Sequence, residues 1–135
     1  MFDAIDTSGS GLTAYRTWLD VLANNIANVN DVSPTSGPAF QAQYVQVQPI
    51  APGPDGVGHG VTETGLPASS AQGVLEYDPH NPVADAKGYV RRPDIDLSEQ
   101  MGNLIMAQRA FQANANVVER STDLYKSAIQ IGKAI

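Results

Sequence analysis

The stretch DLSEQMGNLIMAQRAFQANANVVERSTDLYKSAIQIGKAI, residues 96–135, decides the fold of this chain. Apolar side chains recur in it every seven residues, which places them on one face of an α-helix, and a strand could not keep that period. Asp96 followed by Glu99 has the form of a capping box, and no proline follows Pro93. We therefore predict one long amphipathic helix over 96–135. The residues that recur on its apolar stripe are Leu97, Leu104, Phe111, Val118 and Tyr125, with Met101, Ala107, Ala115, Ala128 and Ile129 at the adjoining helical positions.

A second heptad pattern occupies the amino terminus, over 1–30, and it also predicts a helix. Gly9 and Gly11 each cost about 1 kcal/mol relative to alanine inside a helix, so we expect the first turns to be weak in an isolated monomer. The repeating apolar positions are Ile5, Leu12, Leu19 and Ile26, with Tyr15, Leu22 and Val29 three residues further on.

These patterns predict a mainly α protein with a small β region. We expect the long N- and C-terminal helices to pack as a coiled-coil-like axial domain formed by 1–30 and 95–135. Two helices packing within a small monomer would also explain the heptads. However, at about 1.5 Å per residue the first helix covers only about two thirds of the second. The remaining apolar stripe therefore favours contacts with other subunits.

Asparagines gather at the end of the first helix, at Asn24, Asn25 and Asn28. Asparagine is a mediocre helix former, so the cluster fits a fraying helix end that leads into a turn. The alternative is a set of amide contacts that fixes the register between packed helices, as one buried asparagine does in coiled coils. Candidate partners in the second helix are Gln100, Gln108, Asn114 and Asn116.

Between the helices, residues 31–94 predict a Pro/Gly-rich loop, a few short strands and an extended lead-in. Prolines and glycines exclude any long helix from 30–60, and Pro54-Asp55-Gly56 marks a turn. We expect strands within 40–48, 61–64 and 73–77, forming a hairpin or a three-stranded sheet. Three prolines and one glycine predict that 77–93 stays out of regular structure.

Composition limits the classes of partner. The net charge is −6, and 17–86 contain seven acidic residues and no Lys or Arg, so neither nucleic acid nor an anionic membrane surface is an expected partner. The chain has no cysteine, which excludes disulfides and thiol chemistry. No apolar stretch is long enough to span a bilayer, and the acidic start does not resemble a secretory signal. We expect no membrane insertion and no cleavable signal peptide.

The only cluster that suggests chemistry is Asp78, His80 and Asp85, whose carboxylates and imidazole could bind a metal ion. The segment has two X-Pro bonds and no frame to aim three side chains at one point, which favours ordinary turn chemistry. Ser69 and Ser70 lack a nearby base, and no phosphate loop or dinucleotide fingerprint is present. We therefore predict no catalytic residue, no metal site and no cofactor, with a small metal-dependent enzyme as the remote alternative.

Motifs at both ends of the chain resemble one known family. SGLTA (10–14) and LDVLANNIAN (19–28) resemble the amino-terminal signature of the bacterial flagellar rod and hook axial proteins. DLSEQM (96–101) and LIMAQRAFQANA (104–115) resemble their carboxyl-terminal signature. Pro82, Ala84-Asp85, Gly88-Tyr89-Val90 and Pro93 narrow the resemblance to the proximal rod proteins.

The resemblance implies a structural subunit of the flagellar basal-body rod, the shaft that transmits torque across the periplasm and encloses the export channel. The implied partners are copies of this chain, other rod proteins and the flagellar type III export apparatus. In such an assembly the apolar stripes and the amides Asn24, Asn25, Asn28, Gln108 and Asn114 form the predicted subunit interface. A different rod component of the same family is the nearest alternative.

Overall fold

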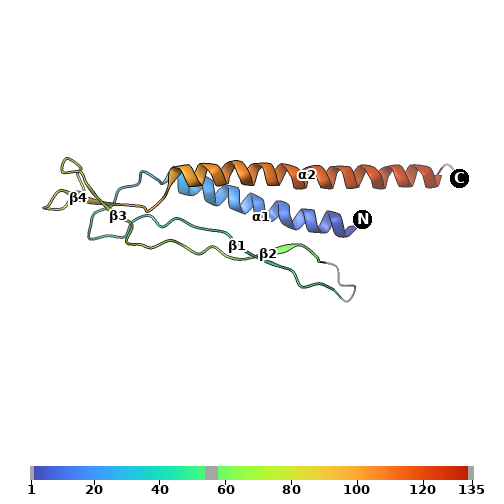
Figure 1. Cartoon of the computed structure of the whole chain (residues 1–135), viewed down its shortest axis with the longest axis horizontal. Coiled ribbons are helices and arrows are strands. Elements are labelled where there is room, and N and C mark those ends of the chain that lie inside the picture. Colours follow the sequence, from blue (N-terminus) through green and yellow to red (C-terminus); the bar gives the residue numbers. More distant parts are fainter. Residues whose placement is uncertain (1, 54–57, 134–135) are drawn as a thin grey trace.

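The computed structural model describes residues 2–53 and 58–133 of the chain. Two long helices lie side by side and antiparallel, and two small strand pairs complete the elongated molecule (Figure 1). The fold is thus mainly helical with a small β region, as the sequence predicts. The helices are α1 (Phe2–Ala27) and α2 (Leu97–Lys133), and the strands are β1 (Gln46–Pro49), β2 (Val61–Gly65), β3 (Val74–Tyr77) and β4 (Tyr89–Arg92).

The start of α2 is fixed by its own sequence. Oδ1 of Asp96 accepts hydrogen bonds from the backbone N–H groups of Ser98 at 2.8 Å and Glu99 at 3.1 Å. These bonds satisfy two N–H groups that the first helical turn leaves without partners. The predicted role of Asp96 at the helix start is confirmed.

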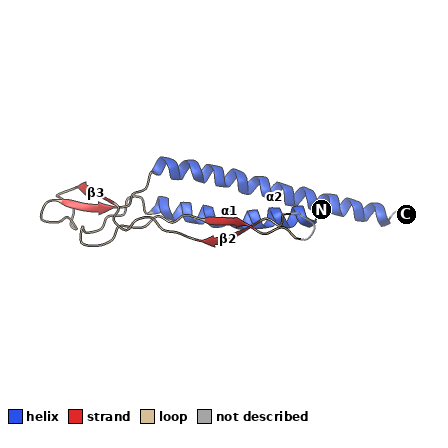
Figure 2. Ribbon diagram, turned by 60° about the horizontal axis from the view of Figure 1, so that its bottom comes forward, coloured by secondary structure: helices blue, strands red, loops and turns tan. Residues whose placement is uncertain are grey.

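The two helices differ in length, with 26 residues in α1 and 37 in α2. Their ends are level where α1 finishes and α2 begins, so the C-terminal part of α2 runs past the N terminus of α1 (Figure 1). α1 is covered on two sides, by α2 and by the β1–β2 pair (Figures 1 and 2). Among the residues described, no helix is both long and apolar enough to cross a lipid bilayer.

The strands form two separate antiparallel pairs, β1–β2 and β3–β4. A strand pair alongside α1 agrees with the predicted hairpin, whereas the three-stranded alternative is wrong. The first strand is shorter than predicted, since only Gln46–Pro49 is regular. The turn predicted at Pro54-Asp55-Gly56 lies outside the described residues.

β4 corrects the prediction that 77–93 stays out of regular structure. Tyr89 pairs with Tyr77, and Arg92 pairs with Val74. On its other edge, Arg91 exchanges two backbone hydrogen bonds of 2.9 Å with Ser33. Both partners are distant in the sequence, so local proline and glycine signals could not reveal this strand.

The hydrophobic core is small and lies near the end of α1, where the chain folds back beneath the helices. Val21 and Leu22 of α1, Ala107 of α2, and Val90 of β4 belong to it. Ala39 and Ala42 add two methyl groups from the segment after α1. Because the core is so limited, most large apolar side chains of α2 stay at the surface.

Two glycines of this fold have opposite roles, which gives a testable prediction. Gly73 has φ +52°, and a Cβ there would collide with the backbone carbonyl of Arg92. Gly102 lies within α2 with open space around it. We predict that Gly73→Ala lowers the free energy of unfolding by at least about 1 kcal/mol. Gly102→Ala should raise it by up to about 1 kcal/mol.

Urea unfolding followed by circular dichroism measures both changes. Equal effects of the two substitutions would contradict this description of the β3–β4 pair.

Candidate functional site

The two helices pack in a fixed register. The side-chain amide of Asn25 donates a hydrogen bond to Oε1 of Gln100 at 3.2 Å, and a Cβ at Gly11 would lie 3.3 Å from Oδ1 of Asn114. In both pairs the two residue numbers add to 125. The residue of α2 that faces a given residue of α1 is therefore found by subtracting the α1 residue number from 125. The first residue of α1 therefore lies opposite about residue 123, and 124–133 extend beyond α1.

The face of α2 that packs on α1 combines two kinds of side chain, each repeated every seven residues. One heptad position holds large apolar residues that are half-buried, namely Leu104, Phe111 and Val118. The other holds small or polar residues that are buried or half-buried, namely Gln100, Ala107, Asn114 and Ser121. By the same register the small Ala107 lies opposite Trp18, and Gly11 faces Asn114, so small residues make room for larger ones across the interface.

Asn25 connects three segments of the chain from a fully buried position, with 1% of its surface exposed. Its amide group donates to the backbone carbonyl of Gln43 at 2.9 Å as well as to Gln100. Its Oδ1 accepts a hydrogen bond of 3.0 Å from the backbone N–H of Gln43. Asn25 thus binds α1 to α2 and to the segment that leads into β1.

The other two asparagines of the cluster act locally. The amide of Asn28 donates to the backbone carbonyl of Asn24 at 2.8 Å and to its Oδ1 at 3.1 Å, which closes the end of α1. The chain then turns, and the N–H of Asp31 bonds to the carbonyl of Asn28 at 3.0 Å. The cluster therefore contains both a helix end, at Asn24 and Asn28, and an interhelical contact, at Asn25.

The residues that the sequence predicts for a subunit interface occupy three environments. Leu22 and Asn25 are buried. The half-buried members are Ile5, Leu12, Leu19, Ile26, Asn28, Leu104, Phe111, Asn114 and Val118. The exposed members are Asn24, Leu97, Met101, Gln108 and Tyr125. Whether they contact neighbouring subunits stays a prediction.

Leu97 and Met101 depart from the expected intrachain stripe, since each is 45% exposed. By the register above, Leu97 lies opposite residue 28, which is already past the end of α1 at Ala27. Met101 points about 100° away from the face that packs on α1, because each residue turns the helix by about 100°. These side chains are open to contacts from outside the chain.

Sequence reasoning missed Val21, which is buried in the core, and Gln43, which the structure places at the Asn25 contact. Ala107, predicted at a position adjoining the apolar stripe, is buried. No local signal marks Gln43, because its role depends on a helix 18 residues earlier.

A second apolar stripe runs along α2 and was also missed. It lies roughly 110° around the helix axis from the face on α1, at about 100° per residue. Leu124 is 62% exposed and Ile131 is 67% exposed. We call this set the second stripe, and its members, all exposed, are Met106, Ala113, Val117, Leu124, Ala128 and Ile131.

The cluster of Asp78, His80 and Asp85 forms turns. Asp78 accepts a hydrogen bond from the side-chain amide of Asn81 at 3.1 Å. Asp85 accepts from the backbone N–H of Tyr89 at 3.0 Å, which lowers the pKa of its carboxyl group. In the described part of the chain, no group of three His, Asp or Glu side chains is arranged to hold a metal ion.

Two family models match the ends of the chain. The model described as "Flagella basal body rod protein" matches 5–33, which contain most of α1. The model described as "Flagellar basal body rod FlgEFG protein C-terminal" matches 86–131, which contain β4 and nearly all of α2. The paired helices and these matches together define a class, the rod proteins of the flagellar basal body.

Relatives along the whole chain specify the family. FlgC rod proteins from Yersinia enterocolitica and Escherichia coli O157:H7 are 35% and 34% identical over 133 residues, which cover 98% of each chain. FlgC from Borreliella burgdorferi is 33% identical over an alignment of 147 residues, covering 97% of each chain. This chain belongs to the FlgC family of flagellar basal-body rod proteins. It is a structural subunit of the rod and not an enzyme, and it assembles with other rod proteins.

The Asn25 contact generates a prediction about stability. Asn25→Ala leaves the partly buried N–H of Gln43 and the buried Gln100 without their partner, so we expect a loss of about 1 to 3 kcal/mol in the free energy of unfolding. Asn24→Ala is the matched control, because Asn24 is exposed on the same helix turn and Asn28 keeps its hydrogen bond to the backbone carbonyl at position 24. Its effect should stay within about 0.5 kcal/mol.

Urea titrations of the two purified variants decide the question. A loss at Asn25 no larger than that at Asn24 would show that the buried amide does not hold the helices together.

Proposed function

We propose that α1 and α2 form the axial part of the rod. In this proposal they pack in a coiled-coil-like manner against helices of neighbouring copies and of other rod proteins, around a central channel. The observation that supports it is the second stripe, which α1 does not cover. A continuous apolar face on an exposed helix is typical of a surface that binds other proteins.

Burial of this surface favours assembly. Complete burial of one large apolar side chain contributes about 1.5 to 3 kcal/mol, and the second stripe presents four such side chains per subunit. They are Met106, Val117, Leu124 and Ile131. α2 is then held on one face by α1 and on the other by neighbours, which explains why one helix carries two apolar stripes.

Torque transmission requires subunits that do not slip. Apolar contacts alone tolerate sliding, because they are not directional. Within the chain, the buried amides of Asn25 and Gln100 specify one register for α1 on α2, as a buried asparagine does in a coiled coil. A rigid helix pair of this kind can pass force from one neighbour to the next as part of a drive shaft.

We also propose that the subunit reaches the periplasmic section of the rod through the flagellar type III export apparatus. Such export requires the chain to travel unfolded. The small core near Val21 and Leu22 supports this proposal, because little buried apolar area has to be exposed again when the fold opens. The absence of cysteine is compatible with it, since no disulfide could trap a folded form.

The second stripe can be tested separately from the fold. Val117→Asp places a charge on the stripe but not on the face that packs on α1, so the purified chain should keep its helix content. In the rod that charge would be buried without a partner, and we expect loss of rod assembly and of swimming. Gln112→Asp is the matched control, because Gln112 is exposed on the same helix outside the stripe.

Motility in soft agar and the protein content of purified basal bodies measure the outcome. Normal swimming with Val117→Asp would contradict burial of the second stripe in the rod. Loss of swimming with both variants would mean that the surface of α2 tolerates no charge, and the stripe would have no special role.

A further inference from the structure

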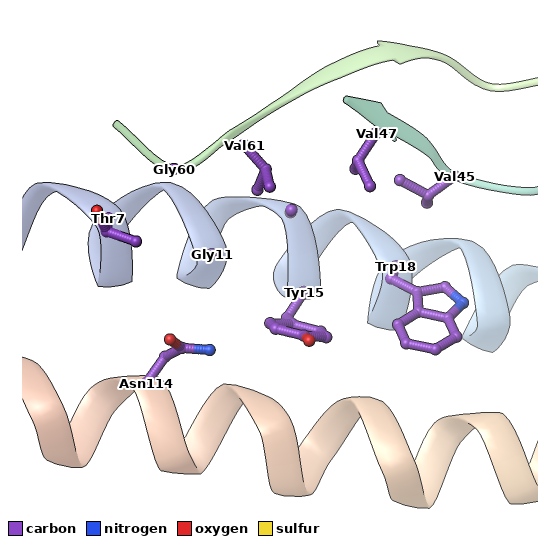
Figure 3. A pocket seen from close by; sticks show the side chains of 10 residues that line it. Thr7, Gly11, Tyr15, Trp18, Val45, Val47, Gly60, Val61 and Asn114 are labelled. Carbon is purple, nitrogen blue, oxygen red and sulfur yellow. The ribbon is translucent and has the colours of Figure 1, made fainter. Parts of the chain in front are cut away.

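A groove runs along the side of α1, between the β1–β2 pair and α2 (Figure 3). Its volume is about 480 Å³, and it extends from Thr7 to Trp18 along α1, with Asn114 at the wall formed by α2. The apolar side chains that line the groove are Ala14, Tyr15, Trp18, Val45, Val47 and Val61.

The outer wall of this α1 groove is held in place. The hydroxyl of Ser10 accepts a hydrogen bond from the backbone N–H of Val61 at 3.1 Å and donates one to the carbonyl of Thr7 at 2.8 Å. Gly60, with φ +96°, lies so close that any Cβ there would collide with the Ser10 hydroxyl. The β1–β2 pair is therefore fixed on α1 at this point, and the groove is a formed feature of the fold.

The chain also carries a segment of matching shape and chemistry, the α2 tail, residues 124–133. In the register described above, most of it extends past the first residue of α1. Leu124 and Ile131 are among the most exposed large apolar side chains of the described chain. At about 1.5 Å per residue the tail is roughly 15 Å long, and the eleven-residue interval from Thr7 to Trp18 spans roughly 16 Å.

Charge also matches between the two surfaces. The α2 tail contains Lys126 and Lys133 and no acidic residue. Glu63 on β2 pairs across the strands with Val47, which lines the groove. Lys126 pairs with Asp123 of its own chain at 3.5 Å, but both side chains are 66% exposed, and such a pair contributes little energy and exchanges easily.

We infer that the α1 groove of one copy receives the α2 tail of a second copy. The tail cannot reach the groove of its own chain, because it continues the axis of α2 away from α1 (Figure 1). The inference rests on the proposed function, in which copies of this chain are neighbours in the rod. It adds which surfaces meet: the apolar side chains of the tail fill the groove, and Lys126 lies near Glu63.

A contact of this kind has a structural consequence. The groove and the tail are different surfaces of the same chain, so the contact is head-to-tail and leaves a free tail on one copy and a free groove on the next. Growth can then continue in one direction, as a rod requires. The α1 groove would be empty only in the copy at one end of such a series of subunits.

Because the chain has no cysteine, cross-linking between introduced cysteines can test this contact cleanly. Cells would produce two differently tagged copies, one with Val47→Cys in the groove and one with Leu124→Cys in the tail. Purified basal bodies would be treated with a short bis-maleimide. Leu75→Cys replaces Leu124→Cys in the control, because Leu75 is 59% exposed on β3, at the end of the molecule farthest from the tail.

The inference predicts a mixed-tag dimer at a level several-fold above that of the Leu75→Cys control. A second pair, Val45→Cys with Ile131→Cys, should give the same dimer if the first pair disturbs packing. If both copies are present in the basal body and neither pair gives a mixed-tag dimer, the inference is overturned. A tail that cross-links only to a different protein would overturn it as well. Absence of the unmodified chain from basal bodies would instead overturn the proposed function, so the two failures are distinguishable.

Discussion

The structure depends on one imbalance: α2 has more apolar surface than the rest of the chain can cover. α1 is shorter, so the C-terminal end of α2 extends past it. α1 also reaches only one face of α2, which leaves the second stripe exposed along the whole length. An apolar surface of this kind is typical of a surface that binds other proteins, and we propose that neighbouring rod subunits cover it.

Polar residues give this apolar packing its precision. Both the nitrogen and the oxygen of the buried Asn25 amide form hydrogen bonds. These bonds connect the helix pair to the segment that leads into β1. Small residues such as Gly11 and Ala107 alternate with large ones across the interface, so a shift by one turn would bring large side chains together. The helix pair is therefore a defined unit, and the strand pairs are positioned on it by long-range contacts such as Ser33 with Arg91.

The features predicted correctly from the sequence are those with local signals. Heptad spacing placed both helices, and Asp96 marked the start of α2. β4 was missed because its partners, Val74–Tyr77 and Ser33, are far away in the sequence. The second stripe was missed for a different reason: alanines separate its large side chains, so the stronger repeat of Leu104, Phe111 and Val118 hid it. The contacts with neighbouring subunits remain predictions, since a single chain does not contain them.

A density map of the assembled rod at side-chain resolution tests the central claim most directly. The measurement is the surface of Met106, Val117, Leu124 and Ile131 that remains accessible in the assembled state. Our account predicts that neighbouring helices bury most of these four side chains. A map in which they face water in every copy, with α2 held by α1 alone, would contradict it.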